Sequence, residues 1–130
     1  MNIRPAHNLL RRIERLRGDI RTEKLFASGN GFIVYPLRVV YLQVDYDENA
    51  PVSVLFSVPK KRIRLAVNRN RIKRLHREAY RLNKQDLIAE MGQKKTSLHL
   101  GIVYLGNEMP DFETIRAKML LALQRIRSAQ

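Results

Sequence analysis

The segment 68–83 carries two opposed stripes when it is wound as a helix at about 100° per residue. One stripe is apolar and consists of Ile72, Leu75, Ala79 and Leu82. The other lies roughly opposite, is cationic, and consists of Arg69, Lys73, Arg77 and Arg81, with Asn70 and Arg74 beside it. The pattern predicts a helix with Asn68 as N-cap that packs on a core with one face and presents cations with the other.

Stability alone does not explain this concentration of charge. Residues 60–84 contain eleven lysines and arginines and one acid, Glu78, so they carry +10 of the net charge of +13. Like charges four residues apart on a helix destabilise it by a few tenths of a kcal/mol per pair. The alternative, a merely solvated face, normally mixes charges of both signs. The segment therefore indicates a polyanionic partner.

The composition bounds the class of protein. A chain of 130 residues is expected to form one domain, here 1–130 with a basic N-terminal extension at 1–14. A net charge of +13 points to nucleic acid first and to an anionic membrane surface second. The sequence contains no long apolar run and no signal-peptide pattern at its N-terminus, and it contains no cysteine. We expect no membrane span and a reducing, cytoplasmic location.

Hydrophobic periodicity predicts four strands and three main helices. Strand-like runs occupy 31–35, 37–46, 52–58 and 97–105, and helices are expected at 19–28, at 68–83 and from 111 onwards, with a further short helix at 85–91. Gly29 and Gly92 are expected to cap helices in the left-handed conformation. In the run 37–46, the even positions are uniformly apolar, which predicts a core-facing even side and a partly open odd side. The order is α-β-β-β-α-β-α, an α+β sandwich with a four-stranded sheet.

No catalytic site of the polypeptide's own is evident. His7, His76 and His99 lack metal-ligand spacing. We expect His99 to be a half-buried packing residue and His76, beside the cationic stripe, to contact phosphate. Asp45, Asp47 and Glu48 form an acidic turn that could bind a cation but is more typical of a solvated turn, and Glu78 is expected to pair with Arg74 or Arg81.

Two aromatic residues could contact unpaired bases. Phe26 ends the first expected helix, and Tyr41 lies on the side of its strand that we expect to be partly open. Stacking on a base contributes about 1–3 kcal/mol. Burial of either residue in the core remains the alternative.

Residues 66–81, AVNRNRIKRLHREAYR, resemble the signature of the bacterial ribonuclease P protein subunit, of the form A-V-x-R-N-R-x-K-R-x-x-R-E. The flanking segments 25–29, LFASG, and 57–61, SVPKK, are similar to the end of that family's first helix and of its third strand. The resemblance extends from about residue 15 to the end of the sequence. Arg64 and Leu65 depart from the family, which usually has a glycine and a basic or small polar residue there, and Thr22 replaces a common aromatic residue.

The resemblance implies both a fold and a function. It implies the αβββαβα order with a mixed sheet and a left-handed crossover between the third and fourth strands. It further implies a protein that joins ribonuclease P RNA, the RNA and its Mg²⁺ ions hydrolysing the 5′ leader from precursor tRNA, with no membrane and no required protein partner. The positions that match the family's RNA-contacting motif are Arg69, Asn70, Arg71, Lys73, Arg74 and Arg77, to which we add Arg81, Lys60 and Lys61 from the same basic segment. Phe26 and Tyr41 match positions in the cleft that holds the leader.

Two other classes remain as alternatives. A structural ribosomal or general RNA-binding protein would also be basic and would lack an active site. A DNA-binding regulator could place the basic helix in a major groove, but that helix lies between predicted strands and does not follow another helix after a short turn.

Overall fold

A computed structural model describes residues 14–130, so His7 and nearly all of the extension 1–14 lie outside the described residues. Four strands form one sheet in the order β1-β2-β4-β3, where β1 is Asn30–Val34, β2 is Leu37–Val44, β3 is Val52–Ser57 and β4 is Ser97–Tyr104. Strand β2 runs antiparallel to β1 and β4, and β3 runs parallel to β4. The sheet is therefore mixed, as expected.

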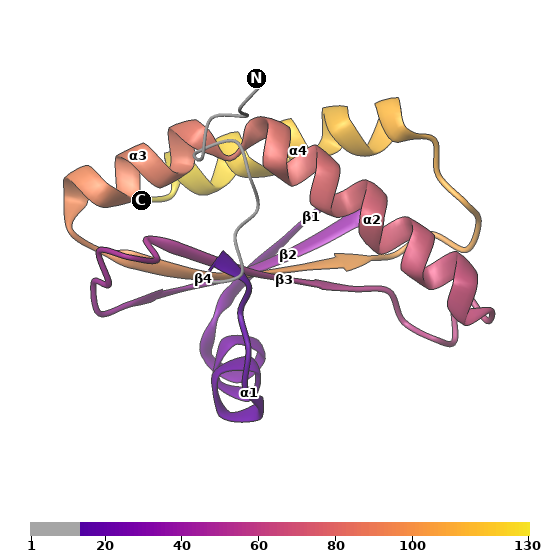
Figure 1. Cartoon of the computed structure of the whole chain (residues 1–130), viewed down its shortest axis with the longest axis horizontal. Coiled ribbons are helices and arrows are strands. Elements are labelled where there is room, and N and C mark those ends of the chain that lie inside the picture. Colours follow the sequence, from indigo (N-terminus) through magenta and orange to yellow (C-terminus); the bar gives the residue numbers. More distant parts are fainter. Residues whose placement is uncertain (1–13) are drawn as a thin grey trace, which may run out of the picture.

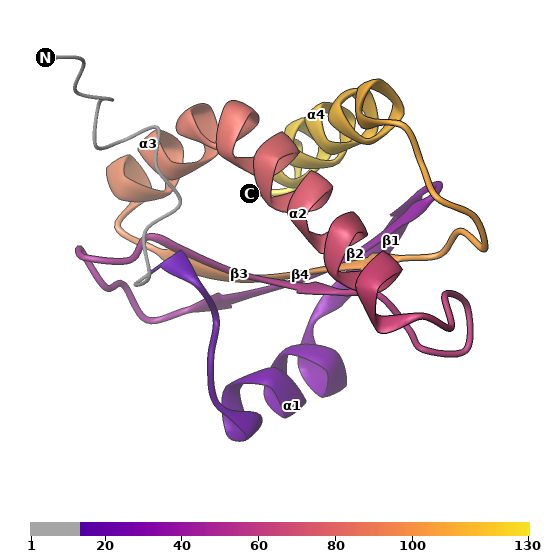
Figure 2. The ribbon, with the colours of Figure 1, turned by 45° about the vertical axis from the view of Figure 1, so that its right-hand side comes forward.

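The helices are divided unequally between the two faces of the sheet (Figure 1). Helices α2 (Ala66–Asn83), α3 (Gln85–Lys94) and α4 (Phe112–Ser128) lie on one face, and α1 (Asp19–Ser28) lies alone on the other. Figure 2 shows the same separation from a second direction. The order αβββαβα and the α+β class are confirmed, with α3 as an additional helix directly after α2. The left-handed sense of the crossover from β3 to β4 stays a prediction.

Strand β2 buries residues on both of its faces and turns its odd side to the main core, so the expectation of a core-facing even side and a partly open odd side was wrong. Leu37 and Val39, on the odd side, are fully buried in the main core under α2 and α4. Val40, on the even side, packs with Leu25 of α1 in a second, smaller cluster. Alternation along a strand identifies its two faces but does not tell which one receives more helices.

Helix α2 begins two residues earlier than predicted. Its N-cap is Leu65, which makes no side-chain capping bond, and Asn68 lies inside the helix. The buried side consists of Ile72, His76, Ala79 and Tyr80, whereas Leu82 is 47% exposed. The steps of four and three residues from 72 through 76 to 79 and 80 keep these side chains on one side of the helix, and position 82 turns away from it.

Neither glycine expected to cap a helix adopts the left-handed conformation in that role. Gly29 has φ −75°, and a glycine is needed there because a Cβ atom would lie 2.4 Å from the Leu25 carbonyl oxygen. Helix α3 continues past Gly92 to Lys94, and Lys95 adopts the left-handed conformation instead, with φ 54°. Helix α1 thus ends at Gly29 as predicted but without the left-handed conformation, whereas the C-cap of α3 lies three residues beyond Gly92. Among the helices of residues 14–130, none is long and apolar enough to cross a membrane.

His76 belongs to the core, so the expectation that it contacts phosphate was wrong. Its side chain is fully buried, and its ring lies 5.6 Å from that of Tyr104 and 6.2 Å from that of Phe56, measured between centroids. Neither ring nitrogen has a hydrogen-bond partner within the described part of the chain. Burial lowers the pKa of His76 to about 4, because the charged imidazolium would lose its hydration.

This burial predicts a specific pH dependence of folding. As the pH falls from about 6.5 to about 4, the unfolded chain protonates His76 while the folded chain does not, so the free energy of unfolding falls. The contribution of His76 is fully present above that range, and its loss amounts to about 3 kcal/mol at most. Urea unfolding at pH 7 and pH 4.5 should show that His76→Leu removes this part of the pH dependence. An identical pH dependence in the wild type and the variant would contradict the assignment.

Candidate nucleic-acid interface

The outer side of α2 and the loop before it form one cationic area, which we call the basic surface. The helix turns these side chains away from the sheet because they lie roughly opposite its buried side. Lys60 and Lys61, in the loop after β3, are exposed, as is Arg64. The basic surface consists of Lys60, Lys61, Arg64, Asn70, Arg71, Lys73, Arg74, Arg77 and Arg81, all of them exposed or partly exposed.

Arg69 does not belong to this surface, although the sequence placed it on the cationic stripe. It lies about 60° around the helix from the buried Ile72. Its Nη1 atom donates hydrogen bonds to the carbonyl oxygens of Ile63, at 3.0 Å, and Arg64, at 2.7 Å. Arg62 acts similarly, donating from Nη1 to the carbonyl oxygen of Leu105 at 2.7 Å. These two guanidinium groups fix the loop that carries Lys60, Lys61 and Arg64.

The cations of the basic surface differ in how they are neutralised. Arg81 pairs with Glu78, with Nε to Oε2 at 3.0 Å, which confirms one of the two expected pairings. That hydrogen bond raises the pKa of Arg81. The pKa of Arg77 is instead lowered, by partial burial first and then by the positive charges of Arg15 and Arg74. Arg77 therefore lies in a field of like charge, which an anionic ligand would relieve.

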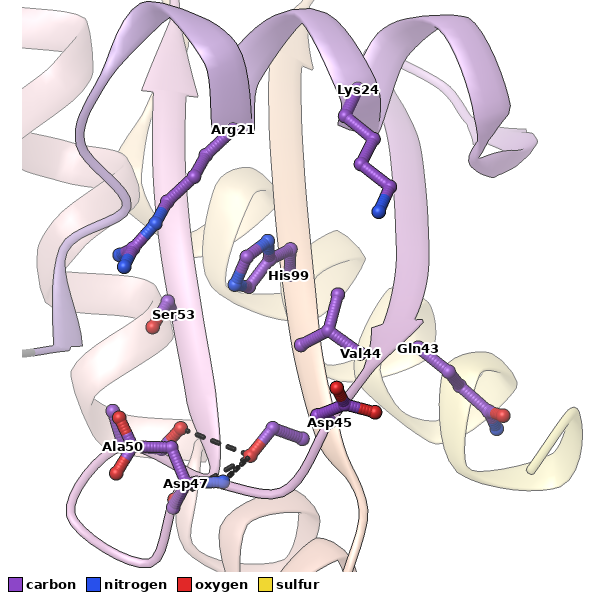
Figure 3. Close-up of a pocket in the computed structure, with 10 residues that line it drawn as sticks. Arg21, Lys24, Gln43, Val44, Asp45, Asp47, Ala50, Ser53 and His99 are labelled. Atoms are coloured by element: carbon purple, nitrogen blue, oxygen red, sulfur yellow. Dashed lines mark hydrogen bonds between the residues drawn. The ribbon is translucent and has the colours of Figure 1, made fainter.

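A cleft of about 440 Å³ lies between α1 and the face of the sheet that α1 covers, which is the face away from α2. Arg21 and Lys24 reach from α1 toward the strands, and His99 of β4 lies on the floor of the cleft (Figure 3). Burial, together with the positive charges of Arg21 and Lys24, lowers the pKa of His99. His99 is half-buried, as expected, but it faces this cleft. The cleft thus has the cations Arg21 and Lys24 on its α1 side, and the carboxylates of Asp45 and Asp47 line another part of it.

Phe26 and Tyr41 do not come together. Phe26 of α1 is 37% exposed and lies over Gly101 of β4, where a Cβ atom would be 3.2 Å from the Phe26 ring. Tyr41 faces the other side of the sheet, packs against the main core and lies 6.1 Å from the ring of Phe32. The interpretation that Tyr41 lies on an open sheet face was therefore wrong, because α4 covers that face.

The acidic turn after β2 is held by hydrogen bonds. The backbone N–H of Asn49 donates to Oδ1 of Asp47 at 3.0 Å, and the backbone N–H of Asp47 donates to the Ser97 hydroxyl at 2.8 Å. Within residues 14–130, no group of three His, Asp or Glu side chains comes together in a way that could hold a metal ion.

Sequence reasoning missed Arg21, Lys24 and His99 as members of one cleft. The spacing of three residues between Arg21 and Lys24 places them on one side of α1, which was a usable signal. Their proximity to His99 depends on α1 crossing the sheet on the face opposite α2, and no local pattern encodes that crossing.

Comparisons with known proteins agree with this geometry. Residues 10–127 match the model of the family described as Ribonuclease P. A "Ribonuclease P protein component" from Porphyromonas gingivalis is 44% identical over 124 residues, which cover 94% of this chain and 89% of that protein. A protein of the same name from Chlorobium phaeobacteroides is 36% identical, with 95% and 91% covered.

Solved structures show the same fold. The ribonuclease P protein of Thermotoga maritima superposes with a TM-score of 0.64 at 26% identity, covering 86% of this chain and 96% of that one. The protein of Staphylococcus aureus superposes with a TM-score of 0.64 at 17% identity, covering 88% and 94%. The chain therefore belongs to the ribonuclease P family, whose protein component binds RNA and takes part in processing the 5′ ends of tRNA.

Proposed function

We propose that this chain binds ribonuclease P RNA through the basic surface and the single-stranded 5′ leader of precursor tRNA through the cleft under α1. The observation that carries this proposal is the gathering of cations on the outer side of α2, whose inner side is buried. Helix α2, which carries most of the basic surface, and α1, which borders the cleft, lie on opposite faces of one sheet (Figure 1). One rigid sheet can therefore hold the catalytic RNA on one face and substrate on the other.

The basic surface is suited to a folded RNA. Lys73 and Arg74 project from one turn of a rigid helix and Arg77 from the next. Lys60 and Lys61 extend from a loop that Arg62 and Arg69 hold in place. Phosphate contacts of this kind position a protein on nucleic acid and are independent of base sequence. Their contribution to binding comes largely from the release of counterions.

The cleft under α1 is suited to a single strand. Arg21 and Lys24 line the cleft and can contact phosphates along the backbone. Phe26 lies on the same helix outside the cleft lining and presents a partly exposed ring on which a base can stack. Because Tyr41 lies on the other face, Phe26 is the one of the two aromatic residues that can contact the leader on the α1 side of the sheet. Neither contact requires a particular base, which suits leaders of different sequence.

We assign hydrolysis to the RNA and to Mg²⁺ ions bound by it. The described residues offer no carboxylate or histidine cluster of their own that fits a metal ion. Bound Mg²⁺ would supply an activated water and stabilise charge on the leaving oxygen. The polypeptide binds and orients both RNAs. We further propose that it works in the cytoplasm and requires no other protein.

Reconstitution tests the function directly. Adding the protein to a bacterial ribonuclease P RNA should raise cleavage of precursor tRNA at low Mg²⁺, because its cations replace part of the charge screening that Mg²⁺ provides. The rate of 5′ leader release is the readout. If the protein binds many RNAs equally and leaves this rate unchanged, it is a general or structural RNA-binding protein instead.

Arg69 should act through the loop and not through its charge. Arg69→Lys keeps the positive charge but loses the guanidinium that spans two carbonyl oxygens, so we expect RNA affinity to fall about fivefold, or about 1 kcal/mol. The salt dependence of binding should stay unchanged. Lys73→Arg is the matched control and should bind as the wild type does. Wild-type affinity for Arg69→Lys would show that the loop does not depend on Arg69.

Phe26 should affect only substrates that carry a leader. Phe26→Ala should weaken the holoenzyme's binding of precursor tRNA by about 1–3 kcal/mol and leave mature tRNA unaffected, because the lost stacking involves a leader base. Tyr41→Leu, on the other face, is the control and should not discriminate between the two. Equal losses for precursor and mature tRNA in Phe26→Ala would refute the leader contact.

A further inference from the structure

A buried ion pair joins Glu14, before α1, to Lys84, at the end of α2. Oε2 of Glu14 lies 2.7 Å from Nζ of Lys84, which separates α2 from α3. Lys84 is fully buried and Glu14 is 5% exposed. Removing one partner of such a pair leaves an uncompensated buried charge, which typically costs about 3–5 kcal/mol. Residue 14 is therefore tied firmly to the end of the basic helix.

The next two residues are tied to the sheet. Arg15 forms a parallel bridge with Val54 of β3, and the backbone N–H of Leu16 donates to the Val54 carbonyl oxygen at 2.8 Å. Leu16 is buried in the small cluster with Leu25 under α1. This short stretch extends the sheet beside β3 (Figure 2). Arg15 thus lies between two fixed neighbours.

The bridge determines which way Arg15 faces. Bridged residues on neighbouring strands point to the same face of a sheet, and Val54 points into the main core, on the α2 side. Arg15 is exposed on that side, at the edge of the sheet, while Leu16 points to the α1 side. Its positive charge reaches Arg77, whose pKa it helps to lower. Arg15 therefore adjoins the basic surface, although 62 positions separate it from Arg77 in the sequence.

Within the described part of the chain, carboxylates neutralise some arginines but not Arg15, Arg74 and Arg77. Arg81 pairs with Glu78, and Arg127 pairs with Glu90 at 2.8 Å. Among residues 14–130, no carboxylate lies within ion-pair distance of Arg15, Arg74 or Arg77. Three uncompensated guanidinium groups close together repel one another, and an anion placed against them would remove that repulsion.

We propose that Arg15 is a phosphate-contacting residue of the basic surface, and that the Glu14–Lys84 ion pair is the device that positions it. The partner is the phosphate backbone of ribonuclease P RNA, so this inference rests on the proposed function. It extends the RNA-binding surface from α2 around the edge of the sheet to the segment before α1.

The test compares Arg15→Ala with Arg116→Ala, which removes the same charge from an exposed site on α4. The dissociation constant for ribonuclease P RNA is measured over a range of salt concentrations. Arg15→Ala should lower the slope of log K against log salt by about 0.7–0.9, the value of one phosphate contact, and Arg15→Lys should restore it. Arg116→Ala should leave the slope at the wild-type value.

The outcomes separate this inference from the proposed function. A wild-type slope in Arg15→Ala, with normal wild-type binding and normal stimulation of cleavage, overturns the inference alone. A wild-type protein that neither binds the RNA nor stimulates cleavage overturns the proposed function and, with it, this inference.

The positioning role is tested by a double-mutant cycle. Glu14→Gln should lower the slope as Arg15→Ala does, and combining the two changes should lower it no further. Thermal melting identifies variants that fail to fold. In that event the charge-swapped Glu14→Lys, Lys84→Glu protein, which keeps an ion pair, replaces the single variant and should show the wild-type slope. Additive losses in the cycle, or a reduced slope in a folded charge-swapped protein, overturn the positioning role.

Discussion

Burial of the inner side of α2 is the interaction on which the rest of the structure depends. Three like-charge pairs at a spacing of four residues destabilise a helix by about 0.2–0.5 kcal/mol each. Burying a large apolar side chain contributes about 1.5–3 kcal/mol, and α2 buries Ile72 and Tyr80 completely. Burial therefore exceeds repulsion, and the helix can present its cations before any RNA is bound. The same burial places His76 in the core and away from the basic surface.

The two faces of the sheet are covered unequally by helices. Three helices fill the face that holds α2, which leaves the other face to α1 alone. Because one helix of ten residues cannot cover four strands, a cleft remains beside it, with Arg21 and Lys24 above His99. The basic surface and the cleft under α1 are thus two consequences of a single asymmetric packing.

Much of the fold could be predicted from the sequence, because the periodicities that distinguish strands from helices are local. The order of elements and the basic helix were recovered in this way, and the pairing of Glu78 with Arg81 was one of two pairings expected for Glu78. What could not be predicted depends on contacts between distant residues. The face on which Tyr41 lies is decided by α4, the hydrogen bonds of Arg69 by carbonyl oxygens in a loop, and the position of Arg15 by its bridge to Val54.

The central claim, that the outer side of α2 lies against ribonuclease P RNA, can be tested by site-directed cross-linking. The chain has no cysteine, so Lys73→Cys and Arg116→Cys each introduce a single attachment point for a short photo-reactive group. We predict RNA cross-links from position 73 in the reconstituted complex and far fewer from position 116. Equal cross-linking from both positions, or cross-linking from position 116 alone, would contradict the account.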